Sequence, residues 1–406
     1  MKVILIHQAF VSPEEAGGTR HYEFASHCIE SGIDFKIIAS NLSYLTGKSV
    51  AEPRGVFAED QVGKVKVIRA RTFSSLHRSF FWRVISFLSF MASSMWAGLR
   101  AGPTDLVMGT TPPIFQAVSA WAIAAIRRKP FLLEVRDLWP EFAIDMGVLK
   151  NPILIRMSRW LERFLYKRAD HILVNSPAYR DYLINKHQIS HSKVSLIPNG
   201  VDVSKFGHVQ DSSEIKAKLG LNDKFVVTYA GAIGLANDIP TILRAAKILE
   251  KEEQIVFLFV GDGKEKQNAV RLSKELNLMN VIFAGAYPKS KMPSILATSN
   301  VCLATLQNIP MFRTTYPNKV FDYMGAERPS ILAIDGVIRE VIEASEGGIF
   351  VNPGDETGLA SAVLRLKNDP ETCKQMGKSA RAYVEKHFNR DVHAREFYQL
   401  ISKLNC

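Results

Sequence analysis

The sequence predicts an α/β fold built from two Rossmann-like domains. Short segments that are apolar throughout, as buried parallel strands are, alternate with helical stretches along the 406 residues. These segments form two series of similar length, and a stretch with turn-forming residues at 197–202 separates them. The chain is long enough for two or three domains, and 47% of its residues are hydrophobic, which is enough to fill a core in each.

The first series begins at residue 3. The apolar run 3–6 is too short for the hydrophobic region of a signal peptide, so we expect it to be a strand. A glycine-bearing loop and a helix over 20–31 follow it. Later apolar runs predict strands at 35–39, 106–108, 131–135 and 172–175.

The second series begins after residue 200. We expect a strand at 225–230, a helix at 240–251 and a strand at 255–260. Further apolar runs predict strands at 281–284, 301–303 and 330–333. Because strands that alternate with helices pair in parallel, each series predicts a parallel sheet of its own.

The chain is basic, with 51 Lys and Arg residues against 40 Asp and Glu residues and a net charge of +11. Such an excess favours an anionic partner: an acidic lipid, a phosphorylated small molecule or a nucleic acid. A basic protein without any polyanionic target is the alternative. The sequence contains no zinc-finger spacing, RNP-like run or basic tail, so we expect no nucleic-acid partner.

The four cysteines lie far apart and form no CxxC pair. This pattern argues against a zinc site and a disulfide scaffold, and it fits a reducing cytosol. The sequence also has no DxD motif to hold a divalent cation against a diphosphate. We therefore expect no metal and no other cofactor, which leaves Lys, Arg and helix N-termini to neutralise a diphosphate group.

Glycines follow three of the predicted strands. They are Gly17 and Gly18 in the first loop, Gly231 and Gly234 in the second, and Gly261 and Gly263 in the third. Ligands of open α/β sheets bind at the carboxyl ends of the strands, where glycines let a phosphate approach backbone N–H groups. Each loop alone is commonly only a turn, but together they predict a phosphate-bearing ligand. The GxGxxG and GxxxxGK[ST] motifs are absent, which disfavours dinucleotide oxidoreductases and P-loop NTPases.

Basic residues lie close to two of these features. Lys264 and Lys266 follow the third loop, and Lys319 lies near the start of another predicted helix. Asn318 is expected to be the N-cap of that helix, over 320–324, so that Lys319 meets a phosphate and Asp322 a ribose diol. The alternatives are a solvated surface charge for each lysine and a helix-dipole partner for Asp322.

At these residues the sequence resembles the retaining GT-B glycosyltransferases of family 4, especially the subgroup that acts in bacterial O-antigen and capsule assembly. The resemblance covers nearly the whole chain, and its segments are 17–20, 134–140, 231–237, 317–324 and 352–355. It implies the GT-B fold, in which two Rossmann-like domains face each other across a cleft. The acceptor domain is then 1–198, completed by a C-terminal helix at 388–406, and the donor domain is 199–387.

The resemblance also implies an activity. A sugar, by default an amino sugar or a deoxy-amino sugar, is moved from a nucleoside diphosphate donor, by default UDP, to a lipid-linked saccharide acceptor. The donor phosphate is thought to take the acceptor proton, so the protein supplies positioning and charge stabilisation. The residues assigned to the donor are Gly18, Gly231, Gly234, Gly261, Gly263, Lys266, Asn318, Lys319 and Asp322. A nucleotide-sugar epimerase of the GT-B type is the alternative function.

The sequence departs from the family pattern in three places. Thr314 and Asp322 stand where the family often has two glutamates, and Ala232 and Asn237 or Asp238 occupy a stretch where many members have Arg and Lys. Where many members have a histidine, this chain has Arg136. We therefore expect Asp137 to be the catalytic acidic residue on the acceptor side and Arg136 to contact phosphate. Asp137 could instead cap the following loop.

Two stretches of the first domain combine bulky apolar residues with basic ones. They lie at 80–99 and 152–168, and the first contains too many polar residues for a membrane span. Such a mixture suits helices that lie in a membrane interface. We therefore expect a peripheral protein on the inner, cytoplasmic face of the cytoplasmic membrane, attached to its anionic surface. The alternative is that both are core helices.

Overall fold

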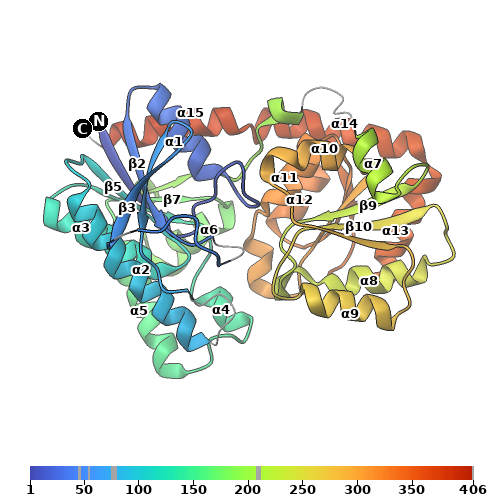
Figure 1. The fold of residues 1–406 in the computed structure, drawn as a ribbon, viewed down its shortest axis with the longest axis horizontal. Coiled ribbons are helices and arrows are strands. Elements are labelled where there is room, and N and C mark those ends of the chain that lie inside the picture. The colour runs from blue at the N-terminus through green and yellow to red at the C-terminus, as the bar shows by residue number, and fades with distance from the viewer. Residues whose placement is uncertain (44–46, 54, 75–79, 207–211, 405–406) are drawn as a thin grey trace. The chain divides into compact units, whose positions relative to one another are not determined.

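The computed structural model describes residues 1–43, 47–53, 55–74, 80–206 and 212–404. The chain divides into two compact units (Figure 1). The first consists of Met1–Ser12, Thr19–Pro198 and Val392–Cys406, and the second of Pro13–Gly18 and Asn199–Asp391. Each unit is built around one sheet with helices packed on it.

The first unit contains an eight-stranded sheet in the order β3-β4-β2-β1-β5-β6-β7-β8. All neighbouring strands are parallel except the pair β3 and β4. The strands are β1 (Lys2–Ile6), β2 (Asp34–Ser40), β3 (Phe57–Val62), β4 (Val65–Ala70), β5 (Leu106–Thr111), β6 (Phe131–Val135), β7 (His171–Val174) and β8 (Val194–Leu196).

The helices of the first unit include the last helix of the chain. The α-helices are α1 (Arg20–Glu30), α2 (Phe80–Arg100), α3 (Ile114–Arg127), α4 (Glu141–Asp145), α5 (Pro152–Arg168), α6 (Pro177–His187) and α15 (Arg390–Lys403), and a 3-10 turn η1 spans His191–Lys193. Phe397 of α15 stacks on Phe24 of α1, with ring centroids 4.7 Å apart. Residues from the far end of the sequence therefore complete this core.

The second unit contains a six-stranded parallel sheet in the order β11-β10-β9-β12-β13-β14. Its strands are β9 (Phe225–Ala230), β10 (Ile255–Val260), β11 (Val281–Gly285), β12 (Val301–Thr305), β13 (Ser330–Ala333) and β14 (Gly348–Phe350). Its α-helices are α7 (Ser213–Leu219), α8 (Ile239–Ile248), α9 (Lys266–Glu275), α10 (Met292–Ala297), α11 (Asn318–Gly325), α12 (Val337–Ser345), α13 (Glu356–Asn368) and α14 (Pro370–His387). Its 3-10 turns are η2 (Val203–Phe206), η3 (Leu235–Asn237), η4 (Lys289–Lys291) and η5 (Pro310–Thr314).

The predicted class, an α/β protein with two parallel sheets, is confirmed. The central strand β10 is apolar and buried along its whole length, because helices cover both faces of a parallel sheet. The antiparallel pair β3–β4 was not predicted, since β3 is a partly exposed edge strand with a polar sequence rather than an apolar run. The short edge strands β8 and β14 were also missed, because three residues give no recognisable periodicity.

Candidate functional site

The start of α11 differs in one detail from the expectation. Asn318 was expected to be the N-cap, but Pro317 occupies that position in an extended conformation, and Asn318 is the first helical residue. Neither residue makes a side-chain capping bond. Proline is well suited to this place because it has no backbone N–H to leave unsatisfied and its ring disfavours a helical conformation in the residue before it. The buried Oδ1 atom of Asn318 has no hydrogen-bond partner within the described part of the chain.

Lys319 reaches from the first turn of α11 to the loop after β9. Its Nζ atom donates hydrogen bonds to the Tyr229 hydroxyl, at 2.7 Å, and to Asn237 Oδ1, at 3.0 Å. A Cβ atom built on Gly231 would lie only 3.0 Å from Lys319 Cε, so the glycine leaves room for the lysine. Burial lowers the pKa of Lys319 to about 7. The predicted phosphate lysine and the second glycine loop are therefore brought together.

Asp322 lies one turn further along α11 and forms an ion pair with Lys289 of η4. Both side chains are largely shielded from solvent, which strengthens the pair relative to a surface one. Lys289 was not among the predicted site residues, because it belongs to a Lys-Ser-Lys run that reads as solvated charge. Its role could be expected only from the rule that a partly buried carboxylate requires a cationic partner.

The first glycine loop also lies beside α11. Its residue Glu15 accepts a backbone hydrogen bond from Lys289 at 3.1 Å. A Cβ atom on Gly18 would lie 3.5 Å from Nδ2 of Asn318, at the start of the helix. Gly18, Asn318 and the Lys289–Asp322 pair therefore lie in one region of the second unit.

The third glycine loop packs on the second. A Cβ atom on Gly261 would lie 1.9 Å from the Gly231 carbonyl oxygen, and one on Gly263 would lie 2.4 Å from the Ile233 carbonyl oxygen. Both glycines have positive φ angles, +149° and +159°. They are therefore required for the close packing of two backbone segments. Lys266 donates instead to Asp262 at 2.8 Å, so its ammonium is engaged with that carboxylate rather than with the residues of α11.

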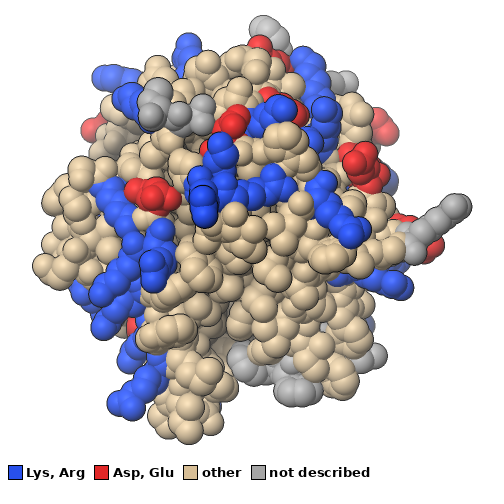
Figure 2. Space-filling model, turned by 90° about the vertical axis from the view of Figure 1, so that its left-hand side faces the viewer, with Lys and Arg blue, Asp and Glu red and all other residues tan. Residues whose placement is uncertain are grey.

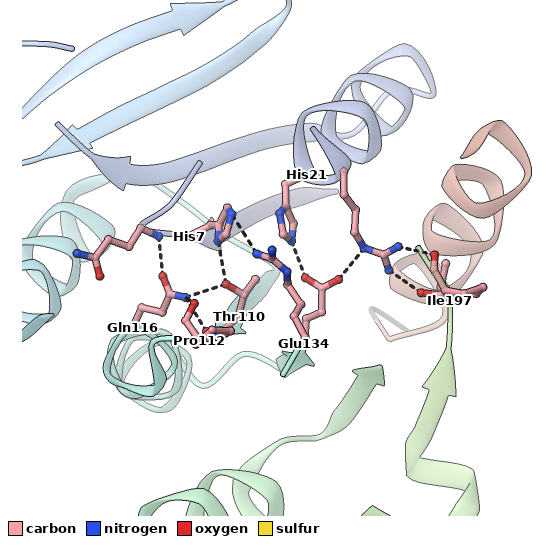
Figure 3. A network of polar contacts seen from close by, with 11 residues as sticks. His7, His21, Thr110, Pro112, Gln116, Glu134 and Ile197 are labelled. Carbon is pink, nitrogen blue, oxygen red and sulfur yellow. Dashed lines mark hydrogen bonds and ion pairs between the residues drawn. The ribbon is translucent and has the colours of Figure 1, made fainter. Parts of the chain in front are cut away.

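The first unit has a buried charged network at the carboxyl end of its sheet (Figure 3). Glu134 of β6 accepts hydrogen bonds from Arg20 Nε at 2.9 Å and from His21 Nε2 at 2.5 Å. Burial opposes ionisation, but His21 and Arg20 outweigh it and lower the pKa of Glu134 well below its usual range. Arg20 also donates hydrogen bonds to the backbone carbonyl oxygens of Pro198 and Ile197. The network therefore connects α1 to the segment that follows β8.

Arg136 follows β6 and lies against His7, which follows β1. Its Nη1 atom lies 3.4 Å from His7 Nε2, while His7 Nδ1 lies 2.9 Å from the Thr110 hydroxyl. Burial, with His21 and Arg136, lowers the pKa of His7 well below its usual value, so the ring is neutral. Since arginine only donates, Nε2 accepts and Nδ1 carries the proton that is donated to Thr110.

Asp137 lies beside Tyr179, whose hydroxyl donates to Oδ1 at 3.5 Å. Burial raises the pKa of Asp137 to about 6, although Arg136 and Tyr179 oppose the shift. Two further oxygens at the ends of neighbouring strands, Thr111 Oγ1 and Asn175 Oδ1, are buried and have no partner among the described residues. This edge therefore offers several acceptors to a ligand that carries hydroxyl groups.

Most of the residues that support the predicted ones carry no recognisable signal in the sequence. No function was predicted for His7, His21 or Arg20. The one indication is that Glu134 interrupts the apolar run 131–135, because a buried carboxylate needs basic partners. Tyr229 gave no signal at all, because an aromatic residue in a strand is ordinarily core. Within the described ranges, no group of three or more His, Cys, Asp or Glu side chains is arranged to hold a metal ion.

Two family models match the chain one after the other. The model described as Glycosyltransferase Family 4 matches residues 17–205, and the model described as Glycosyl transferases group 1 matches residues 211–383. The first match lies mostly in the first unit, and the second lies within the second unit.

The curated relatives have low sequence identity to this chain. Sulfoquinovosyl transferase SQD2 of Arabidopsis thaliana is 28% identical over 291 residues, which are 70% of this chain and 54% of the relative. UDP-Gal:alpha-D-GlcNAc-diphosphoundecaprenol alpha-1,3-galactosyltransferase of Escherichia coli is 24% identical over 255 residues, which are 61% of this chain and 63% of the relative. The match thus spans less than two thirds of the length of each of these relatives.

Solved structures resemble the chain over its full length. The crystal structure of Anabaena Alr3699/HepE in complex with UDP-glucose covers 99% of this chain and 100% of its own, with a TM-score of 0.74 and 16% sequence identity. At that identity the likeness shows the fold alone, and this fold is the predicted GT-B fold.

Proposed function

Because the chain belongs to the retaining glycosyltransferases of family 4, we propose that it moves an amino sugar or deoxy-amino sugar from UDP to a lipid-linked saccharide acceptor. The reaction would belong to the assembly of a bacterial surface polysaccharide. UDP appears in the name of the Escherichia coli galactosyltransferase and in that of the Anabaena structure. The galactosyltransferase acts on a diphosphoundecaprenol-linked sugar. These names support the choice of donor and acceptor class.

The observation that carries the proposal is the cluster at the start of α11. Lys319 and the glycine loop after β9 form a place for a diphosphate, with backbone N–H groups of the helix start nearby. Asp322, one turn further along, accepts hydrogen bonds from the ribose hydroxyls. The ribose must share this carboxylate with Lys289 or displace it.

In this proposal the transfer proceeds without a metal ion. The acceptor hydroxyl forms a bond to the anomeric carbon while the bond from that carbon to the diphosphate breaks on the same face. The departing phosphate oxygen takes the acceptor proton. Lys319 and the helix start stabilise the charge that develops on the diphosphate.

The first unit supplies the acceptor side in this proposal. Asp137 orients the acceptor hydroxyl, and the unpaired oxygens of Thr111 and Asn175 accept hydrogen bonds from neighbouring hydroxyls. Arg136 contacts a phosphate group, and the neutral His7 ring holds its guanidinium without cancelling its charge.

An exposed surface of the first unit supports membrane attachment. Ile153, Met157 and Trp160 of α5 share one helix face and are 68%, 59% and 65% exposed. Arg156 and Arg163 flank this face and are also exposed. α3 contacts both α5 and α2, and α2 adds further exposed apolar side chains, Met95 and Trp96. No described helix is long and apolar enough to cross a membrane.

The surface charge fits the same proposal. In the view of Figure 2, Lys and Arg side chains predominate over Asp and Glu, and basic and uncharged side chains adjoin each other at its lower edge. Exposed apolar residues next to basic ones suit the headgroup region of an anionic bilayer. We therefore propose that the protein is peripheral on the cytoplasmic face of the membrane.

A transfer assay tests the function. The purified protein is incubated with a set of UDP-sugars and a bacterial lipid extract, and organic-soluble product is measured. The proposal predicts that one donor yields lipid-linked product and that Asp322→Ala reduces the yield. Conversion of the donor to a free epimer without an acceptor would instead establish the epimerase reaction.

A further inference from the structure

The nitrogen of Lys319 has a hydrogen-bonding environment that matches an uncharged amine. An amine has two N–H donors and one lone pair, whereas an ammonium ion has three donors. Within the described part of the chain, Nζ has two acceptors, the Tyr229 hydroxyl and Asn237 Oδ1. Tyr229 donates its own hydroxyl hydrogen to the Ala232 carbonyl at 2.7 Å, so its oxygen is free to accept from the lysine.

The surroundings of Lys319 offer it no negative charge. Among the described residues it forms no ion pair, and the carboxylate on its own helix, Asp322, is paired with Lys289 of η4. The centroid of the Tyr229 ring from β9 lies 4.1 Å from Nζ, and this ring face attracts a positive charge although it carries no negative one. Asn237 from η3 is neutral. Tyr323, the next side chain of α11, directs its hydroxyl to the backbone of β9 and β12. Both tyrosines have raised pKa values because they are buried, so both are uncharged.

We propose that Lys319 is largely uncharged in the free protein above neutral pH and takes up one proton from solvent when a nucleoside diphosphate binds. The proton adds to the lone pair of Nζ, and the new N–H bond points to a phosphate oxygen. Tyr229 and Asn237 are positioning residues that keep the other two N–H bonds away from the ligand. The inference rests on the proposed function, because it requires a diphosphate at this site.

The direction of the pH effect follows from the burial of Lys319. Burial lowers the pKa of its amine to about 7, and the negative charge of a bound nucleoside diphosphate raises it again. Below pH 7 the free protein already carries the proton, so binding takes up little. Above pH 7 the free protein lacks it, and binding takes up about one proton until the pH reaches the higher pKa of the complex.

Calorimetry measures this proton directly. UDP is titrated into the full-length protein at pH 6 and pH 8 in buffers with different ionisation enthalpies, and the slope of binding enthalpy against ionisation enthalpy gives the number of protons. We expect an uptake of about one proton at pH 8 and clearly less at pH 6. UDP is fully ionised at pH 8, so its own titration does not contribute there.

Two variants isolate the lysine. Lys319→Arg carries a permanent charge, so it should bind UDP with no proton uptake at pH 8. Asn237→Asp places a carboxylate 3 Å from Nζ in a side chain of the same size, so Lys319 should be protonated before binding. That variant should bind UDP more weakly and also show no uptake. Thermal melts establish that both variants are folded.

The outcomes separate the two claims. UDP binding to the wild type without proton uptake at pH 8 overturns this inference and leaves the proposed function intact. The same uptake in wild type and Lys319→Arg also overturns it, because another group then binds the proton. If the wild type binds no UDP at any pH, the proposed donor and the inference both fail.

Discussion

Several charged side chains of the described residues are buried with partners of opposite charge, whereas Lys319 of the candidate site is not. Glu134 is buried with two basic partners, and Asp322 has Lys289. Lys319 has only neutral acceptors. Since an unpaired buried charge is costly, such an exception indicates a place for a charged ligand.

Asp137 should control the acid limb of the pH profile. Burial raises its pKa to about 6, so its ionised fraction falls as the pH drops below 6. We expect kcat at saturating donor to fall with it, and Asp137→Asn to lower kcat and remove this limb. His7 does not produce a limb near 6, because burial, with His21 and Arg136, lowers its pKa well below its usual value. An unchanged acid limb in Asp137→Asn would remove the carboxylate from the catalytic step.

The sequence predicts residues that belong to motifs, but it does not predict their partners. Lys319 and Asp322 stand in a recognisable segment, whereas Tyr229 and Lys289 lie 90 and 33 positions away from the side chains they contact. Only the folded arrangement of β9, η4 and α11 brings them together. The role of the third loop could not be predicted either. In a sequence, a glycine required for backbone packing cannot be distinguished from one that lies beside a phosphate.

Elements with a clear period were easier to predict than those without one. The strands β9, β10 and β13 have the expected bounds, since each is an apolar run closed by turn residues. β3 has no such run, since three consecutive polar residues, 59–61, form its centre at the edge of the sheet, and it was missed. For α2 and α5, the sequence did not distinguish a core helix from a helix that lies in a membrane interface. Composition alone does not show which face of a helix is covered by the rest of the protein.

The helix α5 should attach the protein to anionic vesicles. We expect co-sedimentation at low salt that falls at high salt, because basic side chains near such a surface contribute about 1 kcal/mol each and are screened by ions. The double variant Arg156→Ser, Arg163→Ser should bind less, and so should Trp160→Ser. Arg159 is left unchanged because it forms two hydrogen bonds to Glu141 of α4.

A matched control removes two exposed lysines of the second unit. Lys218→Ser together with Lys274→Ser loses the same charge but should leave vesicle binding nearly unchanged. Equal losses in both double variants would mean that net charge, rather than the face of α5, attaches the protein. No binding to anionic vesicles at low salt would contradict the proposed membrane attachment.

The inner side of α5 should make stability depend on pH. Glu162 is buried, accepts from the Tyr166 hydroxyl at 2.9 Å and lies 3.7 Å from His187 Nε2. Burial raises the pKa of Glu162 to about 8 and lowers that of His187 to about 4, so both are neutral at pH 7. On Glu162 the folded protein then holds a proton that the unfolded chain loses above about pH 4.5, so the contribution of Glu162 to stability falls as the pH rises from there to 8. The contribution of His187 has the opposite sign and rises between about pH 4 and 6.5.

Glu162→Gln keeps the acceptor for Tyr166 and removes the titration. We expect its melting temperature to exceed that of the wild type at pH 8.5, by several degrees for a gain of roughly 1–2 kcal/mol, and to match it closely at pH 5. Thermal melts at the two pH values measure this. A pH-independent difference would show that Glu162 does not titrate within this range.

At the scale of the whole molecule, each unit has its own sheet and core, and the last helix of the chain belongs to the core of the first unit. The sequence indicated two series of elements, but the packing of α15 on α1 depends on a contact between residues at opposite ends of the chain. No local sequence pattern predicts such a contact. The expectation for this helix came from the resemblance to a family.

The enzyme should work without a metal ion. The proposed charge stabilisation comes from Lys319 and the start of α11. Transfer activity should therefore persist in excess EDTA and should not increase when magnesium or manganese is added. Loss of activity in EDTA with recovery on adding either ion would require a different diphosphate site.

If the start of α11 binds the donor nucleotide, loss of the Asp322 carboxylate must weaken the binding of UDP. Isothermal titration in EDTA compares the wild type with Asp322→Ala, and with Glu252→Ala as a control that breaks another carboxylate–lysine pair of the same unit. We expect the control to bind like the wild type and Asp322→Ala to lose roughly 1–3 kcal/mol of binding free energy. Unchanged affinity in a folded Asp322→Ala variant would contradict the account.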